Sequence, residues 1–114
     1  MRERIRDKGR LEHILESIDD VVEFINGVDF EEFMKNKILR FAIIRGLAII
    51  GEASYKLTKE FREGHKEIEW KSIISMRHIL VHGYYDTDEI IVWDTANSLS
   101  ELKEKIQILY NNEP

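Results

Sequence analysis

The chain has 114 residues, no cysteine, one proline and a formal net charge of −5. The absence of cysteine excludes disulfide frameworks and thiolate chemistry, and the length predicts one domain over residues 1–114 with a single core. No apolar run approaches the roughly 20 residues that cross a bilayer, and the charged start is not typical of a signal peptide, so we expect a cytoplasmic protein without a membrane segment.

The acidic net charge argues mildly against nucleic-acid binding, although local basic patches decide such affinity. One basic stretch covers residues 1–10, where Arg and Lys outnumber Glu and Asp. The simplest interpretation of this stretch is a solvated first turn of a helix.

The first predicted elements are helices, as the scarcity of proline and glycine favours. Apolar residues between Leu11 and Ile25 recur at intervals of three and four, which predicts an amphipathic helix that Asn26-Gly27 ends. Asp29-x-x-Glu32 is similar to a capping box and predicts a short helix ending near Asn36.

A second long helix is predicted from Lys37 to about Arg62. It is apolar on nearly all sides between Ile38 and Ile50, so it is either central in a bundle or partly covered by another subunit. Gly46 and Gly51 lower its helix propensity, and a close helix contact is one reason to tolerate them.

The last two predicted helices complete the fold. One begins near Trp70 and stops near Gly83, and the other is capped by Asp86-x-x-Glu89 and has an inner face from Val92 to Leu109. Four long helices and one short piece predict an all-α, antiparallel four-helix bundle.

Residues 75–86 combine a fixed cation, a titrating group and phenols. Arg77 suits phosphate binding, His82 suits proton transfer near neutral pH, and Tyr84 offers a hydroxyl and a stacking face. These residue types fit RNA cleavage by internal attack, which needs a proton acceptor, a proton donor and a cation for the phosphorane.

A straight helix does not bring Arg77 and His82 together, because they lie about 140° apart around the axis and roughly 7.5 Å along it. The arginine stem could curl around the helix, or the backbone could deviate near Gly83. Alternatively, two copies of the motif could share one cleft across a two-fold dimer axis.

Other candidates carry simpler interpretations. His78 and His82 are four residues apart and could ligate zinc with Asp86 or a residue from elsewhere, but no Glu lies between them as in H-E-x-x-H, so we expect neither metal nor cofactor. Glu52 is either a buried partner of Arg77 or Arg45, or an exposed residue.

Further residues have a structural interpretation. Tyr84 and Tyr85 could be packing residues, and His13 and His65 are expected at the surface. The charged stretch Lys56 to Lys66 is expected to be a solvated helix face.

The pattern R-x4-H-x-Y, formed by Arg77, His82 and Tyr84, resembles the motif of HEPN domains, and the rest of the chain resembles their HepT-like branch. Further matching segments are Phe30-Glu31-Glu32-Phe33, Ile49-Ile50-Gly51-Glu52-Ala53, Ile68-x-Trp70, Met76-Arg77 and Val92-Trp93. The chain departs from the family at His78, where Asn is common, at Lys66 and Glu69, where prolines are usual, and at Leu99-Ser100 in place of Leu-Pro.

The resemblance implies a homodimeric HEPN bundle and a metal-independent ribonuclease toxin, with RNA as substrate. With this chemistry, we expect His82 to act as acid or base, Arg77 to bind phosphate, and Tyr84 to position the substrate or stack a base. His78, although it departs from the family, is expected to assist. The resemblance also implies a nucleotidyltransferase antitoxin that AMPylates Tyr84. The alternative is a non-catalytic nucleotide-binding or scaffold subunit of such a transferase complex.

Overall fold

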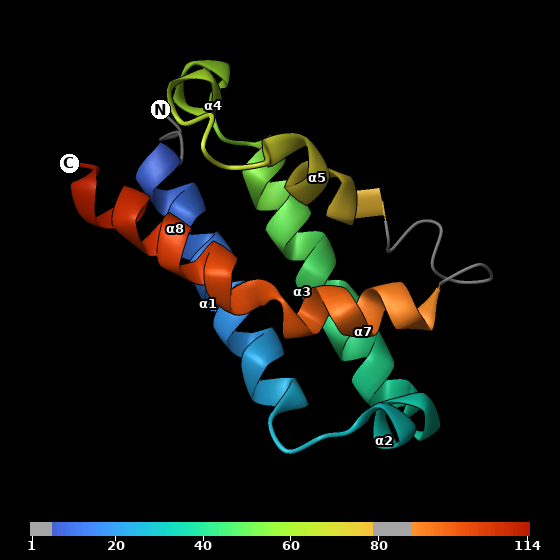
Figure 1. The fold of residues 1–114 in the computed structure, drawn as a ribbon. Helices are drawn as coiled ribbons and strands as arrows, with labels where there is room; N and C mark the ends of the chain where they lie inside the picture. Colours follow the sequence, from blue (N-terminus) through green and yellow to red (C-terminus); the bar gives the residue numbers. More distant parts are fainter. Residues whose placement is uncertain (1–5, 79–87) are drawn as a thin grey trace, which may run out of the picture.

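The computed structural model describes residues 6–78 and 88–114, and every regular element in these ranges is a helix. The two long helices α1 (Asp7–Ile25) and α3 (Lys37–Tyr55) run antiparallel, and α8 (Leu99–Asn112) packs along α1 (Figure 1). The shorter α7 (Glu89–Asn97) crosses α3 and contacts α1. The predicted all-α antiparallel bundle is therefore confirmed.

The seam between α1 and α3 depends on Gly46. A Cβ atom at this position would lie 2.4 Å from Cγ2 of Val21, and the carbonyl of Gly46 accepts a 2.8 Å hydrogen bond from the buried Ser17 hydroxyl. The missing side chain thus permits a close helix contact, which confirms the reason predicted for this glycine.

Helix caps explain where α2 and α3 begin. Asp29 accepts a hydrogen bond from the Glu32 amide at 2.8 Å and starts α2 (Phe30–Lys35), as its capping pattern predicts. Asn36 ends α2 and also caps α3, because its side chain accepts from the Leu39 amide at 3.0 Å.

The predicted helix from Lys37 to Arg62 is wrong in its extent, because α3 ends at Tyr55 and α4 covers Lys59–Gly64. Thr58 caps α4 by accepting a hydrogen bond from the Phe61 amide at 3.1 Å. The Thr58 amide and hydroxyl both donate to the Asp7 carboxylate, each at 2.8 Å. A contact with α1 therefore fixes the break.

The last two predicted helices also differ from the structure. The helix that starts at Trp70 is α5 (Trp70–Ser75), followed by the 3-10 turn η1 (Met76–His78), and its predicted continuation to Gly83 lies outside the described residues. The final helix divides at Ser98 into α7 and α8. The cap of α7 is Asp88, whose carboxylate accepts from the Ile90 and Ile91 amides, and not the predicted Asp86.

The described helices enclose one apolar cluster. Its fully buried side chains come from α1, α2, α3 and α8: Leu11, Ile14, Ile18, Val21, Phe33, Ile43, Leu47, Ile50 and Ile106. Trp93 of α7 packs its ring 4.9 Å from that of Phe33. Within the described ranges, none of the helices has the length and apolar character needed to cross a membrane.

Candidate active site

The backbone of Arg77 lies directly against α3 at Gly51. A Cβ atom on Gly51 would come within 2.3 Å of the Arg77 amide nitrogen and within 3.0 Å of the Ile73 carbonyl oxygen. Since these are backbone atoms, they cannot give way by a side-chain rotation. Gly51 therefore allows α5 and η1 to approach α3 closely, as predicted for a helix contact, and this approach places the motif arginine.

The side chain of Arg77 stacks on Tyr55, one helical turn beyond Gly51. The guanidinium carbon lies 3.7 Å from the centroid of the Tyr55 ring, a distance at which cation–π attraction contributes about 0.5–2 kcal/mol. Nε of Arg77 is buried and has no hydrogen-bond partner among the described residues. Two residues of one α3 face thus fix the position of a cation that retains hydrogen-bonding capacity.

Arg77 lines two cavities that we name by the elements around them. The α1–α3 cavity has a volume of about 290 Å³, and its charged lining residues are Arg10, Arg45, Glu52, Lys56 and Arg77. The α4–α5 cavity has a volume of about 460 Å³. Its lining residues include the aromatic side chains Tyr55 and Trp70 and the charged side chains Lys59, Arg62, Glu63, Lys66, Lys71 and Arg77.

Both cavities carry excess positive charge, in contrast to the net charge of −5 for the chain. Each includes a single carboxylate, and this carboxylate is near a lysine one helical turn away: Glu52 is 3.7 Å from Lys56, and Glu63 is 3.9 Å from Lys59. Such exposed pairs are weak. The surface on both sides of Arg77 is therefore suited to an anion.

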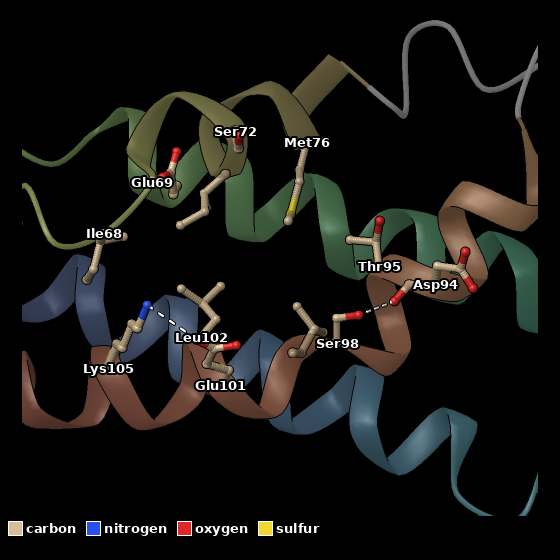
Figure 2. A pocket seen from close by; sticks show the side chains of 12 residues that line it. Ile68, Glu69, Ser72, Met76, Asp94, Thr95, Ser98, Glu101, Leu102 and Lys105 are labelled. Carbon is tan, nitrogen blue, oxygen red and sulfur yellow. Dashed lines mark hydrogen bonds and ion pairs between the residues drawn. The ribbon is translucent and has the colours of Figure 1, made fainter.

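Another cavity, of about 480 Å³, lies between α5 and the α7–α8 pair and has the opposite character. Its floor is apolar and its rim carries the carboxylates Glu69, Asp94 and Glu101, with Lys105 bonded to Glu101 at 3.5 Å (Figure 2). Met76 points into this cavity, whereas its neighbour Arg77 lines the two basic ones. The single turn η1 thus separates an acidic from a basic surface.

Only some of the other candidate site residues lie in the part of the chain that the structure describes. His78 is exposed at the end of η1, whereas His82, Tyr84 and Tyr85 lie outside the described residues, so the distance between Arg77 and His82 stays a prediction. The zinc alternative also stays untested, because it needs His82, and Asp86, one possible third ligand, lies outside the described residues as well. Within residues 6–78 and 88–114, no three His, Asp or Glu side chains are grouped as metal ligands.

Three further predictions concern single side chains near these cavities. Glu52 is exposed and pairs with Lys56, so the exposed alternative is correct. His13 is exposed as predicted, and it lines the α1–α3 cavity. His65 is half-buried, because its ring packs 4.4 Å from that of Phe61.

Sequence reasoning missed Tyr55 and the basic residues around Arg77. The stretch Lys56 to Lys66, predicted as a solvated face, contributes Lys59, Arg62 and Lys66 to the α4–α5 cavity. The spacing of three between Lys59 and Arg62 was a signal that these two residues lie on one side of a helix, whereas Lys66 follows the end of α4. The spacing of four between Gly51 and Tyr55 is the corresponding signal on α3.

Comparisons with known proteins agree with the resemblance of the whole chain to HepT-like proteins. The sequence model of the family described as "Ribonuclease HepT-like" matches residues 14–109. A protein of Methanocaldococcus jannaschii named "Putative RNase MJ1380" is 40% identical over 103 residues, covering 90% of this chain and 94% of that protein. The "Probable ribonuclease HepT" of Thermococcus cleftensis is 39% identical over 103 residues, with the same coverage of both chains.

A further relative, from Caldanaerobacter subterraneus, is named "Putative RNase TTE0752" and is 39% identical over 104 residues, which are 90% of this chain and 93% of that protein. The search of solved structures gave no match. Because the family model covers most of the chain and these relatives align along nearly their whole length, the chain belongs to the HepT-like family of ribonucleases.

Proposed function

We propose that the chain is a metal-independent endoribonuclease, the toxin of a toxin–antitoxin pair, acting on RNA in the cytoplasm. The observation that carries this proposal is the position of Arg77. In a chain of net charge −5, its guanidinium stacks on Tyr55 between two cavities with excess positive charge. An RNA phosphate is the anion that membership of a ribonuclease family suggests for this position.

The reaction is internal attack on the phosphodiester. The 2′-oxygen bonds to phosphorus as a base takes its proton, the bond to the 5′-oxygen breaks, and an acid gives that oxygen a proton, leaving a 2′,3′-cyclic phosphate. Arg77 stabilises the charge of the phosphorane, and His82 transfers a proton. His78 assists from the end of η1, and Tyr84 positions the substrate.

The active form is a homodimer, in which two copies of the motif share one cleft. Support comes from α3, whose apolar residues are not all covered within one subunit. Ile38 is 82% exposed and Phe41 is 45% exposed. A second subunit would bury these side chains and bring His82 of one chain near Arg77 of the other.

The antitoxin is a minimal nucleotidyltransferase that AMPylates Tyr84: the phenol oxygen bonds to the α-phosphorus of ATP, and pyrophosphate leaves. A phenol is a poor nucleophile at its usual pKa of about 10, so the transferase has to supply the base. The added AMP carries a negative charge and a bulky adenosine. Both would oppose the approach of an RNA phosphate to Arg77.

The test is RNA cleavage in EDTA by the purified protein, beside the Arg77→Ala and His82→Ala variants. We expect cleavage by the unmodified protein and a loss of activity in both variants. Cleavage that His82→Ala leaves unchanged would refute the assignment, and cleavage that appears only with added divalent metal would refute metal independence.

The second candidate is a non-catalytic nucleotide-binding or scaffold subunit of a nucleotidyltransferase complex. The observation in its favour is the same anion-binding surface around Arg77, which would also bind a nucleotide without cleaving RNA. An unmodified protein that binds nucleotides but leaves RNA intact in the same assay would support it.

A further inference from the structure

We propose that the α4–α5 cavity is a binding subsite for the single RNA strand next to the phosphate that Arg77 contacts, an inference that rests on the proposed ribonuclease function. The subsite binds backbone phosphate through Arg62, Lys66 and Lys71 and stacks a base on Tyr55. None of these residues belongs to the R-x4-H-x-Y motif.

Charge is the first reason. Figure 1 shows α4 and α5 over the same end of α3, and the cavity between them carries five basic side chains and one carboxylate. Among the described residues, Arg62, Lys66 and Lys71 form no ion pair with a carboxylate, and the one carboxylate, Glu63, is near Lys59 instead. Local concentrations of unpaired cations of this kind attract nucleic acid whatever the total charge.

Unsatisfied donors are the second reason. Nε of Arg62, like that of Arg77, is buried and has no hydrogen-bond partner in the described part of the chain. A buried donor without a partner is unfavourable. Phosphate oxygens between these two guanidinium groups would accept from their terminal N–H groups rather than from the buried Nε atoms, and arginine binds phosphate with short, charge-assisted hydrogen bonds.

The aromatic side chain of Tyr55 is the third reason. Tyr55 is 47% exposed as a residue although Arg77 stacks on its ring, so the side chain leaves surface that a base can contact. Aromatic side chains beside a basic groove are the common arrangement in proteins that bind single strands, because every base has a face that can stack. Trp70, the other aromatic residue that lines the cavity, is buried, and its Nε1 donates to the His65 carbonyl at 2.9 Å.

The shape also fits a single strand. The cavity volume of about 460 Å³ lies in the range of roughly 300–1,000 Å³ typical of small-ligand sites, which suits a nucleotide unit. The hydrogen bonds from Thr58 to Asp7 fix the start of α4, which forms one side of the cavity, against α1.

The first test measures the affinity for a short single-stranded 2′-O-methyl RNA, which cannot be cleaved because its attacking oxygen is blocked. The variant Lys66→Glu/Lys71→Glu is compared with Lys35→Glu/Lys105→Glu, which changes the net charge equally outside the two basic cavities. We expect the first variant to bind about tenfold more weakly or worse, while the control binds like the unmodified protein. The slope of log Kd against log salt should fall by about 0.7 for each phosphate that the variant no longer binds.

The second test removes the aromatic ring of Tyr55, on which Arg77 stacks and a base would stack. Tyr55→Leu should weaken binding of the same oligonucleotide by about 5- to 150-fold, the range for loss of one stacked base, whereas Tyr55→Phe should bind like the unmodified protein. Equal affinity in the Leu and Phe variants would overturn the assignment of Tyr55.

Cleavage assays distinguish this inference from the proposed function. With a cleavable RNA, Lys66→Glu/Lys71→Glu should raise KM and leave kcat nearly unchanged, because the lysines act on binding and not on the reacting atoms. If cleavage requires Arg77 but the lysine variant binds like its control, the subsite is refuted and the ribonuclease remains. If no RNA is cleaved but the lysine variant binds more weakly than its control, the subsite stands and the catalytic proposal fails.

Discussion

Substituting Gly51 by alanine should impair catalysis without touching a motif side chain. An alanine Cβ would lie 2.3 Å from the Arg77 amide nitrogen, whereas ordinary contacts begin at about 3.4 Å. The backbone of η1 must therefore move away from α3 by about 1 Å, and Arg77 moves with it. Displacements of this size in a reacting site can lower the rate about 10²-fold.

The effect on stability should be smaller than the effect on the rate. Alanine is more favourable than glycine within a helix by about 1 kcal/mol, and overpacking typically costs about 1–3 kcal/mol. These terms partly cancel, so the Gly51→Ala variant should lose about 0–2 kcal/mol of unfolding free energy, as measured by chemical denaturation, and should remain folded.

Gly46→Ala is the matched control on the same helix. Its Cβ would be 2.4 Å from Val21 Cγ2, a similarly tight contact, but on the α1 side and away from the motif. Cleavage of a fluorogenic RNA should fall strongly in Gly51→Ala and stay near the unmodified rate in Gly46→Ala. A folded Gly51→Ala variant that cleaves at the unmodified rate would show that the close approach of η1 to α3 does not position Arg77 for catalysis.

Three other outcomes follow from single contacts. Light scattering at micromolar concentration should show that the unmodified protein is a dimer. The Ile38→Lys variant should be a monomer without cleavage activity, because Ile38 is 82% exposed on α3. A monomeric unmodified protein would contradict the shared cleft. Asp7→Ala should lower the free energy of unfolding in urea by about 1 kcal/mol through loss of its hydrogen bonds to Thr58, and unchanged stability would refute this role. Co-expression with the cognate transferase should add one AMP mass to Tyr84; a gain on Tyr85 would correct the residue, and a neutralised but unmodified chain would refute covalent inhibition.

Helix content and helix starts could be predicted because they depend on local chemistry. The periodic stretch Leu11 to Ile25 lies within α1, and Asp29 caps α2 through its own neighbour in the chain. The contact at Gly46 was also predictable, since a glycine within an apolar helix costs propensity that a close contact can offset.

The helix breaks at Lys56 and Ser98 could not be predicted from periodicity. Thr58 is a usable cap, but its amide and hydroxyl bind Asp7, which lies 51 residues earlier in the chain. The charged residues near Thr58 are compatible with a continuous helix, so the sequence pattern does not show that α3 ends before Thr58. Tertiary contacts, not local propensity, decide where α3 ends.

The residues of the candidate site also differ in how far the sequence reveals them. Arg77 could be predicted because its spacing to His82 and Tyr84 is a local pattern. Tyr55 and Arg62 were missed because helical spacing alone does not show that α3 and α4 lie beside Arg77, where Tyr55 stacks on Arg77 and Arg62 lines the same cavity. A motif search therefore recovers the cation but not the surface around it.

The acidic net charge and the proposed binding of RNA are compatible because charge is segregated around η1. Met76 points to a cavity whose rim carries Glu69, Asp94 and Glu101, while Arg77, the next residue, lines two cavities with excess positive charge (Figure 2). An RNA phosphate is attracted to one side of this turn and repelled from the other. The distribution of charge would therefore orient a strand towards Arg77, and net charge alone does not describe such a surface.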